Sequence, residues 1–482
     1  MAAQPLLNRI CMDGGSSSPV NTSGATFIDS GPTARVSREG SGPSRWRAHL
    51  AILVSALAVI IGACTTPPPP LPRLDVPGNA PAARATPCSR DITGTSPGAP
   101  AGSPDVDVRF DRASNTITLV RGENVSIPVL SDAVDEPLLR EVEPGTWLLT
   151  ANITVLPEAS LHISSADVSW LRMASGDGRF TAIKAFGGDI DIDGTCITSW
   201  NENAEQVDDD HRDGRSYLLA RDGATMTIDD SELRFLGSGD VESYGLSWRT
   251  EGTTGHIRGS VVSHLYYGLY SYGVDGLQVQ DNEFHDNILY GVDPHTNSRN
   301  LVIERNLVHH NGKHGIILAE ECVDSVIRDN IVYDNKHHGI VMYLHSDRNV
   351  IEGNESFRNA AQGININESN DNIIRNNRVY DNGESGVGVT QTARANLVEG
   401  NELRGNKKDG IRLVSEAATT TVRGNTIGRN ARYGVYIDTV SGYDVTGNTI
   451  FNNRIGVVVR GDEVDEDDNK VFDNSQGDMM AR

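Results

Sequence analysis

The sequence of 482 residues has little cysteine and an excess of negative over positive charge. Among its five cysteines, Cys88, Cys196 and Cys322 are too widely spaced for the short Cys pairs of a structural zinc site. Lysine and arginine number 42 against 65 aspartate and glutamate residues, so the formal net charge of −23 argues against a nucleic-acid partner. Gly-Gly-x-Gly-x-Asp nonapeptides are absent, which excludes calcium-binding roll modules.

Part of the acidic charge lies in residues 208–210 and 462–468, which we interpret as solvated loops. Flexible carboxylate clusters also suit Ca²⁺, so calcium stays an alternative, and no other cofactor is expected. A disulfide between two of the three cysteines can form in an oxidising compartment, but the sequence does not select the pair.

The first hundred residues differ in composition from the rest. Residues 1–44 are rich in Ser, Gly, Pro and Ala, and Arg45 and Arg47 precede an apolar run at 50–63 that has signal-peptide length. The run ends Ile61-Gly62-Ala63-Cys64, which resembles the lipobox of bacterial lipoproteins and implies a lipid on Cys64. The alternative is an ordinary signal peptide with an incidental cysteine. Residues 65–104 are rich in Pro, Ala and Ser and predict a tether, so we expect an exported, membrane-anchored monomer.

The remainder is dominated by a repeat of 23 or 24 residues. Its anchors are Asn282, Asn306, Asn330, Asn354, Asn377, Asn401, Asn425 and Asn448, and a second Asn follows each of them by five. A glycine recurs four residues later, from Gly291 to Gly434, and counting backwards extends the register to Gly268 and Gly245. A fixed period of this length indicates stacked supersecondary units.

Each repeat contains short apolar alternations and no segment long enough for a helix, so the units are coils of strands. The sequence predicts an all-β, right-handed parallel β-helix over 236–478, with residues 105–235 forming the cap and first coils. Residues one and three after each glycine alternate as apolar pairs and should fill the interior, for example Val292 and Pro294. Residues two and four after it should then point outward.

The outward face carries the chemically informative residues. Tyr290, Asp293 and His295 occur together in the stretch Tyr290-Gly291-Val292-Asp293-Pro294-His295. Neighbouring coils lie about 4.8 Å apart, so Arg249, two coils earlier, should stand in the same column as His295 with Tyr272 between them. Pro294 cannot donate a ladder hydrogen bond, and such a break beside ionisable side chains is typical of a functional site.

This stretch resembles the Tyr-Gly-x-Asp-Pro-His signature of mannuronan C5-epimerases, which convert mannuronate to guluronate within alginate. The resemblance extends more loosely over residues 140–460. It implies that His295 is the catalytic base or a partner of the reacting carboxylate, Asp293 its orienting carboxylate, and Tyr290 the second proton-transfer group. Two positions depart from the periplasmic enzymes of this family, because Thr296 stands where they carry Asp and Glu320 where they carry Arg.

Epimerisation at C5 needs two proton-transfer groups and a cation that neutralises the carboxylate. His295 titrates in a suitable range, and Tyr290 serves better as an acid. Arg249 is the candidate cation, with Lys313 or a calcium ion held by Glu320 as competitors. Further candidates for binding an anionic polysaccharide are Tyr267, Tyr270, Tyr272, His314, Glu320, His338 and Tyr343.

Two other functions stay open at this point. The same carbanion can expel the C4 oxygen, which would make the protein a polysaccharide lyase. A non-catalytic carbohydrate-binding lipoprotein is the third reading, favoured by Thr296 and Glu320 if they mark a decayed site. The stacked His309, His310, His337 and His345 are interpreted as structural.

Overall fold

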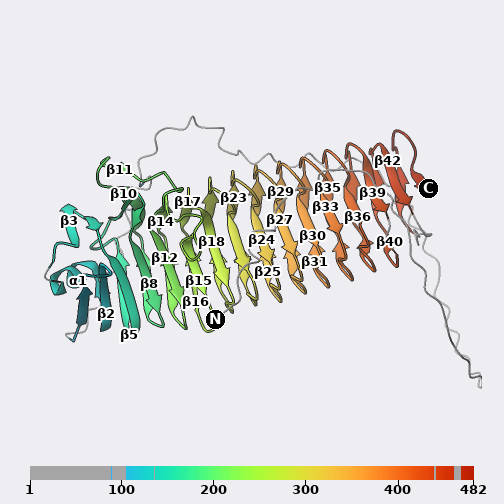
Figure 1. Ribbon diagram of the computed structural model, residues 1–482. Coiled ribbons are helices and arrows are strands. Elements are labelled where there is room, and N and C mark those ends of the chain that lie inside the picture. Colours follow the sequence, from blue (N-terminus) through green and yellow to red (C-terminus); the bar gives the residue numbers. More distant parts are fainter. Residues whose placement is uncertain (1–87, 89–104, 135, 439–440, 461–467, 482) are drawn as a thin grey trace, which may run out of the picture. The chain divides into compact units, whose positions relative to one another are not determined.

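The computed structural model describes residues 88, 105–134, 136–438, 441–460 and 468–481. Strands stack in sequence order along a solenoid, with each coil adding three strands (Figure 1). One such coil contains β21 (Val292–His295), β22 (Val302–Glu304) and β23 (Leu307–His309), followed by β24 (Ile316–Ala319), β25 (Val326–Arg328) and β26 (Ile331–Tyr333). Each strand pairs in parallel with its counterpart one repeat later, as Val302 does with Val326. The expected parallel β-helix is confirmed.

One outward face carries the candidate residues. Its strands begin with β8 (Ala182–Phe186), β12 (Tyr217–Arg221) and β15 (Gly245–Arg249), and continue through β18 (Tyr267–Tyr272), β21 and β24. They are followed by β27 (Ile340–Tyr343), β30 (Ile364–Asn367), β33 (Val387–Thr390), β36 (Ile411–Val414), β39 (Tyr433–Asp438) and β42 (Ile455–Arg460). The strands of this face pair in parallel with one another from β8 to β42.

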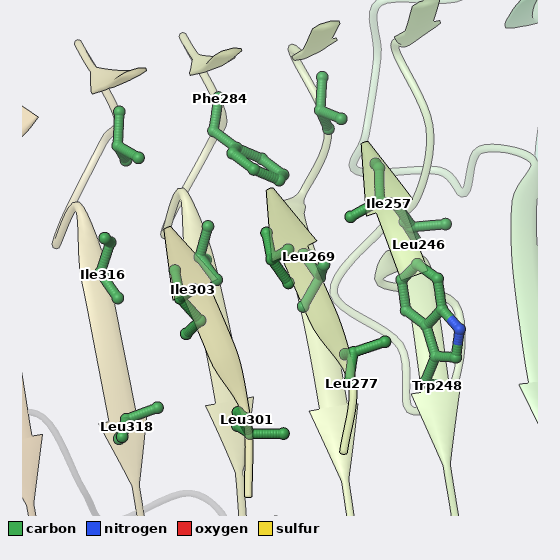
Figure 2. Packing of buried hydrophobic residues seen from close by; sticks show 14 of the residues in the cluster. Leu246, Trp248, Ile257, Leu269, Leu277, Phe284, Leu301, Ile303, Ile316 and Leu318 are labelled. Carbon is green, nitrogen blue, oxygen red and sulfur yellow. The ribbon is translucent and has the colours of Figure 1, made fainter. Parts of the chain in front are cut away.

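The interior is filled by the residues that the alternation predicted. Leu246 and Trp248 of β15, Leu269 of β18, and Ile316 and Leu318 of β24 are fully buried and lie in register between coils (Figure 2). Space at the corners is tight, because a Cβ on Gly315 would lie 2.4 Å from a methyl of Val332. Only glycine fits there, which explains its recurrence.

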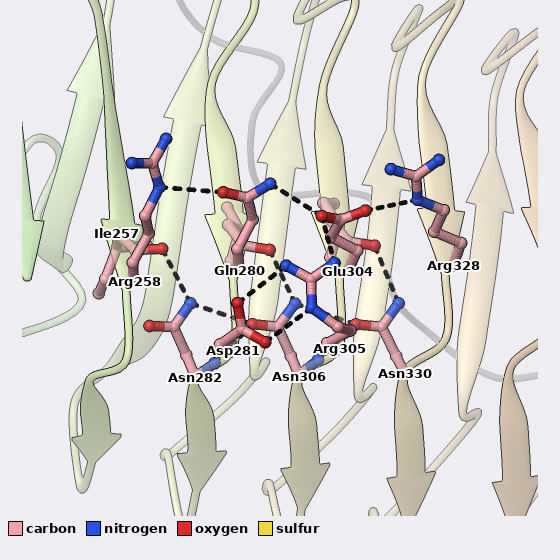
Figure 3. Close-up of polar contacts among 12 residues, drawn as sticks. Ile257, Arg258, Gln280, Asp281, Asn282, Glu304, Arg305, Asn306, Arg328 and Asn330 are labelled. Atoms are coloured by element: carbon pink, nitrogen blue, oxygen red, sulfur yellow. Dashed lines mark hydrogen bonds and ion pairs between the residues drawn. The ribbon is translucent and has the colours of Figure 1, made fainter. Parts of the chain in front are cut away.

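The asparagine repeat forms hydrogen-bonded ladders inside the coil corners. Asn306 is buried and fully hydrogen-bonded. Its backbone N–H and its Nδ2 both donate to Oδ1 of Asn330 at 2.9 Å, and Nδ2 also donates to the carbonyl of Val279. Asn282 and Asn306 make the same contact (Figure 3). The ladders satisfy backbone groups that the turns leave without strand partners, and so fix the register of the face above.

The N-terminal end of the solenoid is closed by antiparallel and helical elements. Strand β1 (Asp107–Asp111) pairs antiparallel with β2 (Thr116–Ser126), and β3 (Leu139–Glu143) with β4 (Thr146–Leu149). Helix α1 (Ile127–Ala133) begins at the N-cap Ser126 and buries Ile127 and Leu130. These elements cover the first core layer, as a solenoid end requires.

A disulfide joins Cys88 to Cys196, the first residue of β10 (Cys196–Asn201), while Cys322 is a buried free thiol. Cys64, the apolar run at 50–63 and the acidic segment at 462–467 lie outside the described residues. Within the described part, no helix is long and apolar enough to cross a membrane. Asp208 differs from its interpretation as a solvated loop residue, because it is buried and accepts a hydrogen bond from Ser175.

Candidate active site

The strand register places the predicted column in one line. Arg249 pairs with Tyr272, Tyr272 with His295, and His295 with Ala319 on successive strands β15, β18, β21 and β24. The ladder between β21 and β24 skips Asp293 and Pro294, as expected where proline has no N–H to donate. The side chains of Arg249 and His295 therefore emerge from the same face, two coils apart.

A second column of rings runs beside the first. Tyr267 lies 5.3 Å from Tyr290, Tyr290 stacks on His314 at 5.3 Å, and His314 stacks on His338 at 5.2 Å between ring centroids. Burial lowers the pKa of His314 well below its usual value and that of His338 to about 3, so both imidazoles are neutral. Nδ1 of each accepts a backbone N–H, from His338 and from Gln362 respectively, which leaves the ring proton on Nε2. Nε2 of His338 lies 3.3 Å from the Asn365 side-chain amide, so the available neutral donor of this column is Nε2 of His314.

His295 is half-buried, with a quarter of its side chain exposed. Its ring stacks on Tyr270 at 5.7 Å, and its Nδ1 lies 2.7 Å from the Thr296 hydroxyl. Burial lowers the pKa of His295, the Glu320 carboxylate raises it, and the charge of Arg249 lowers it further. The net direction is downward, so His295 is neutral at neutral pH and able to accept a proton.

Arg249 is only 8% exposed, although it stands on the outward face. Its guanidinium carbon lies 4.6 Å from the Tyr270 ring centroid and 5.2 Å from that of Tyr244. Within the described part of the chain, its Nε and Nη2 are buried and have no hydrogen-bond partner. A buried cation with two unsatisfied donors is costly, and a negative charge bound nearby would offset that cost.

Asp293 is 1% exposed beneath this ring cluster. After burial, its negative charge is the next cause that raises the pKa of Tyr267 and of Tyr270, so both phenols keep their protons. Oε2 of Glu320 lies 3.8 Å from Nδ1 of His295, and Thr296 bridges the two residues. The orienting role that the resemblance implied for Asp293 therefore stays a prediction.

Thr296 and Glu320 contact each other. The Thr296 hydroxyl donates to Oε2 of Glu320 at 3.0 Å, on the side of the His295 ring that carries Nδ1. The two departures from the family pattern are therefore one local arrangement around the histidine. Sequence reasoning identified both positions but did not pair them.

The coils after His295 provide a small apolar surface. Ile317, Ala319 and Val341 are buried against one another on the outward face, with Tyr290 and Tyr343 packed at their edges. The Lys313 ammonium lies 5.3 Å from the Tyr290 ring centroid. Tyr272, in contrast, is 42% exposed.

Tyr244, which contacts Arg249, was not predicted as a site residue, although the repeat places it directly before Gly245.

Three histidines and Glu320 are the possible metal ligands on this face. His314, His337 and His338 bring ring nitrogens within 4.8 Å of one another. Because Nδ1 of His314 and of His338 accepts a backbone N–H, their Nε2 atoms carry protons and offer no lone pair to a metal. Glu320, the predicted calcium holder, is engaged by Thr296. The imidazoles therefore do not fit a metal in this arrangement, while calcium binding at Glu320 stays a prediction.

Comparison with known families places the chain among β-helix proteins. A family model described as periplasmic copper-binding protein (NosD) matches residues 189–406, and one described as right handed beta helix region matches 356–481. A crystal structure of a variant of the periplasmic alginate epimerase AlgG superposes with a TM-score of 0.62 at 24% identity, covering 73% of this chain and 85% of that one. This likeness shows the right-handed fold.

Sequence relatives carry one common name. The mannuronan C5-epimerase of Pseudomonas putida is 33% identical over 199 residues, covering 38% of this chain and 37% of the relative. The mannuronan C5-epimerase AlgG of Azotobacter vinelandii is 30% identical over 202 residues, covering 39% and 38%. The chain thus matches less than half of the length of these relatives. Over that shared segment, the chain is related to the mannuronan C5-epimerases, as its Tyr290 to His295 signature indicated.

Proposed function

We propose that the protein is a C5-epimerase of a uronic-acid polysaccharide, converting mannuronate to guluronate in an alginate-like polymer. The observation that carries the proposal is the buried guanidinium of Arg249, whose Nε and Nη2 lack partners among the described residues and which shares Tyr270 as a neighbour with His295. A cation and a neutral base on one face are the two groups that C5 proton abstraction demands. The names of the sequence relatives support the same reaction.

In the proposed mechanism, His295 removes the C5 proton. The C5–H bond breaks, the proton passes to the imidazole, and the electron pair moves into the adjoining carboxylate group. Arg249 neutralises this developing enolate with its positive charge, in buried surroundings where charge is weakly screened. Tyr290, which precedes β21 while His295 ends it, donates its phenolic proton to the opposite face of C5 as the electron pair returns to that carbon. Proton exchange with water then reprotonates Tyr290 and deprotonates His295.

The remaining candidates serve as sugar-binding groups. Tyr267 and Tyr343 offer ring surfaces, and exposed Tyr272 borders the base. The protonated Nε2 of His314 offers a donor, and His338 supports this ring by stacking on it while its own Nε2 contacts Asn365. Tyr270 orients the two central groups, since it contacts both Arg249 and His295. Glu320 acts on the base rather than on a sugar, through its contact with Thr296.

We also propose that the chain is exported. The Cys88 to Cys196 disulfide supports an oxidising compartment, and the names of similar proteins include the word periplasmic. Lipid attachment at Cys64 would then hold the solenoid at a membrane surface, facing outward. Radiolabelled fatty-acid incorporation, compared with a Cys64→Ser variant, tests the anchor separately from catalysis.

The function is tested by proton NMR of polymannuronate after incubation with the protein. The appearance of guluronate signals without chain cleavage supports the epimerase. Unsaturated uronate ends, detected by their ultraviolet absorbance, would instead identify a lyase. Binding to the polymer with neither product would indicate a non-catalytic carbohydrate-binding protein.

A further inference from the structure

The geometry points to a hydroxyl relay in which Glu320 and Thr296 hold the proton of His295 on Nδ1 and leave Nε2 as the base. The inference deepens the proposed function and rests on it for its catalytic meaning, although the tautomer itself can be measured without any activity. Thr296 and Glu320 are thereby positioning residues, which act on the substrate only through His295.

Counting hydrogens selects the direction of the relay. The Thr296 hydroxyl has one hydrogen, and its Oγ1 lies 3.0 Å from Oε2 of Glu320, which as a carboxylate oxygen can only accept. The 2.7 Å contact between Oγ1 and Nδ1 of His295 is then a hydrogen bond only if Nδ1 is the donor. A neutral imidazole that donates from Nδ1 has its lone pair on Nε2.

A second contact at Nδ1 of His295 favours the opposite tautomer. The backbone N–H of Thr296 lies 3.0 Å from the same Nδ1 and would favour the opposite tautomer, in which Nδ1 accepts. In that alternative the Thr296 hydroxyl would turn its hydrogen to Nδ1, and the 3.0 Å contact between Oγ1 and Oε2 of Glu320 would be left without a hydrogen. The charged acceptor at the end of the relay makes the first arrangement stronger, because hydrogen bonds in line with a carboxylate are the stronger class.

The surroundings of the other ring nitrogen are consistent with this assignment. No hydrogen bond to Nε2 of His295 is found among the described residues. The groups that face the ring from neighbouring strands are Tyr270 and Tyr272 of β18, Arg249 of β15 and uncharged Ala319 of β24. When Nε2 takes up the C5 proton, the positive charge formed on the ring is stabilised at Nδ1 through the relay.

The relay also explains why Thr and Glu occur together. Either residue alone would leave the Nδ1 side incomplete, since the hydroxyl needs an acceptor and the carboxylate is 3.8 Å from the ring. Glu320 has a positive φ of 59°, a conformation that non-glycine residues rarely adopt. The corner thus holds the carboxylate toward the preceding coil.

The direct test is nitrogen-15 NMR of histidine-labelled protein above the titration range of His295, with the signal assigned by its loss in His295→Gln. We expect a protonated Nδ1 and an unprotonated Nε2. Thr296→Val should shift His295 toward the other tautomer, whereas Thr296→Ser, which keeps the hydroxyl, should not. A protonated Nε2 in the wild-type protein would overturn the relay.

Steady-state kinetics provide a second test of the relay. Thr296→Val should lower kcat by about tenfold to a hundredfold with little change in KM, and Thr296→Ser should restore it. Glu320→Gln removes a charge that raises the pKa of His295, so the acidic limb of its pH profile should move to lower pH.

Thr390→Val is the matched control, because Thr390 lies on the same face and its hydroxyl contacts Asn367. Equal kcat in wild type and Thr296→Val would contradict the relay, while failure of wild type to epimerise would contradict the proposed function only.

Discussion

The guanidinium of Arg249 lies over the ring of Tyr270, 4.6 Å from its centroid, and the same ring stacks on His295. A buried cation and a neutral imidazole are thereby held on one aromatic side chain, from three successive coils. This arrangement positions the carboxylate-binding group and the base relative to each other before substrate arrives, which is the condition for electrostatic stabilisation without reorganisation.

Replacing Arg249 tests the neutralising role. Arg249→Ala should lower kcat by about a hundredfold to a thousandfold, and Arg249→Lys should retain part of the activity because it keeps the charge but loses the planar donor pair. Steady-state kinetics on polymannuronate measure both. Arg258→Ala is the control, since Arg258 is exposed on β16 (Thr254–Arg258). Full activity of Arg249→Ala would assign neutralisation to Lys313 or to a metal.

Treatment with a chelator distinguishes a bound metal ion from the side-chain cations Arg249 and Lys313. If Arg249 neutralises the carboxylate, EDTA treatment should leave the rate of epimerisation within about twofold of the untreated rate, because no step needs an ion. The rate is followed by NMR before and after dialysis. A loss of activity that added Ca²⁺ restores would move the role to calcium.

Asp293 provides a test that does not depend on turnover. Its charge contributes to the raised pKa of Tyr267 and of Tyr270, so Asp293→Asn should lower the pH at which these phenols ionise. Ultraviolet titration of tyrosinate reports the change. We also expect a large loss of activity, smaller than that of His295→Ala. Activity within about twofold of wild type would show that Asp293 only supports the turn before Pro294.

Because His314 is neutral in the folded protein, we expect the folded state to lose stability in acid. Its pKa in the folded protein lies well below its usual value of 6.5, mainly because of burial, whereas in the unfolded chain it is ordinary. The unfolded state therefore binds more protons below about pH 6.5, and the free energy of unfolding falls as pH decreases, by up to about 1.4 kcal/mol per pH unit. His314→Gln should reduce this slope in urea titrations at several pH values. Exposed His345 supplies the control His345→Gln, which should leave the slope unchanged.

The disulfide predicts a redox-sensitive stability. Cys88 and Cys196 are 108 residues apart, and opening a loop of that size should cost about 2–4 kcal/mol. Dithiothreitol should lower the Tm of the wild-type protein. A Cys88→Ser variant should have the lower Tm already and should not respond to the reductant; an equal response would place the sensitivity elsewhere.

The regular coils could be predicted from sequence because their period fixes the register. Counting from Gly291 back to Gly245 correctly placed Arg249 in the column of His295, since each intervening residue lies in a repeat with the same corners. The first coils could not be counted in this way. Tyr217 pairs with Ala182, at a much longer separation than the repeat, because the segment between them contains the loop with Asp208.

The orientation of side chains at the corners was beyond the sequence pattern. Thr296 and Glu320 are one repeat apart, so the period places them on adjacent coils, but it does not specify the side-chain orientations that bring Oγ1 to Oε2. The disulfide partner was similarly hidden, because Cys88 precedes the repeats. The first contact depends on side-chain orientation within the register, and the second on a residue outside the repeats.

The central claim is that the face bearing His295 transfers the C5 proton of a polymeric uronate. Its most direct measurement is deuterium uptake at C5 of polymannuronate in heavy water, followed by NMR for the wild-type protein and for His295→Ala, with circular dichroism to confirm that the variant is folded. We expect deuterium at C5 of newly formed guluronate with the wild-type protein, and uptake lower by several orders of magnitude with the folded variant. Absence of uptake with wild type, or equal uptake with His295→Ala, would contradict the account.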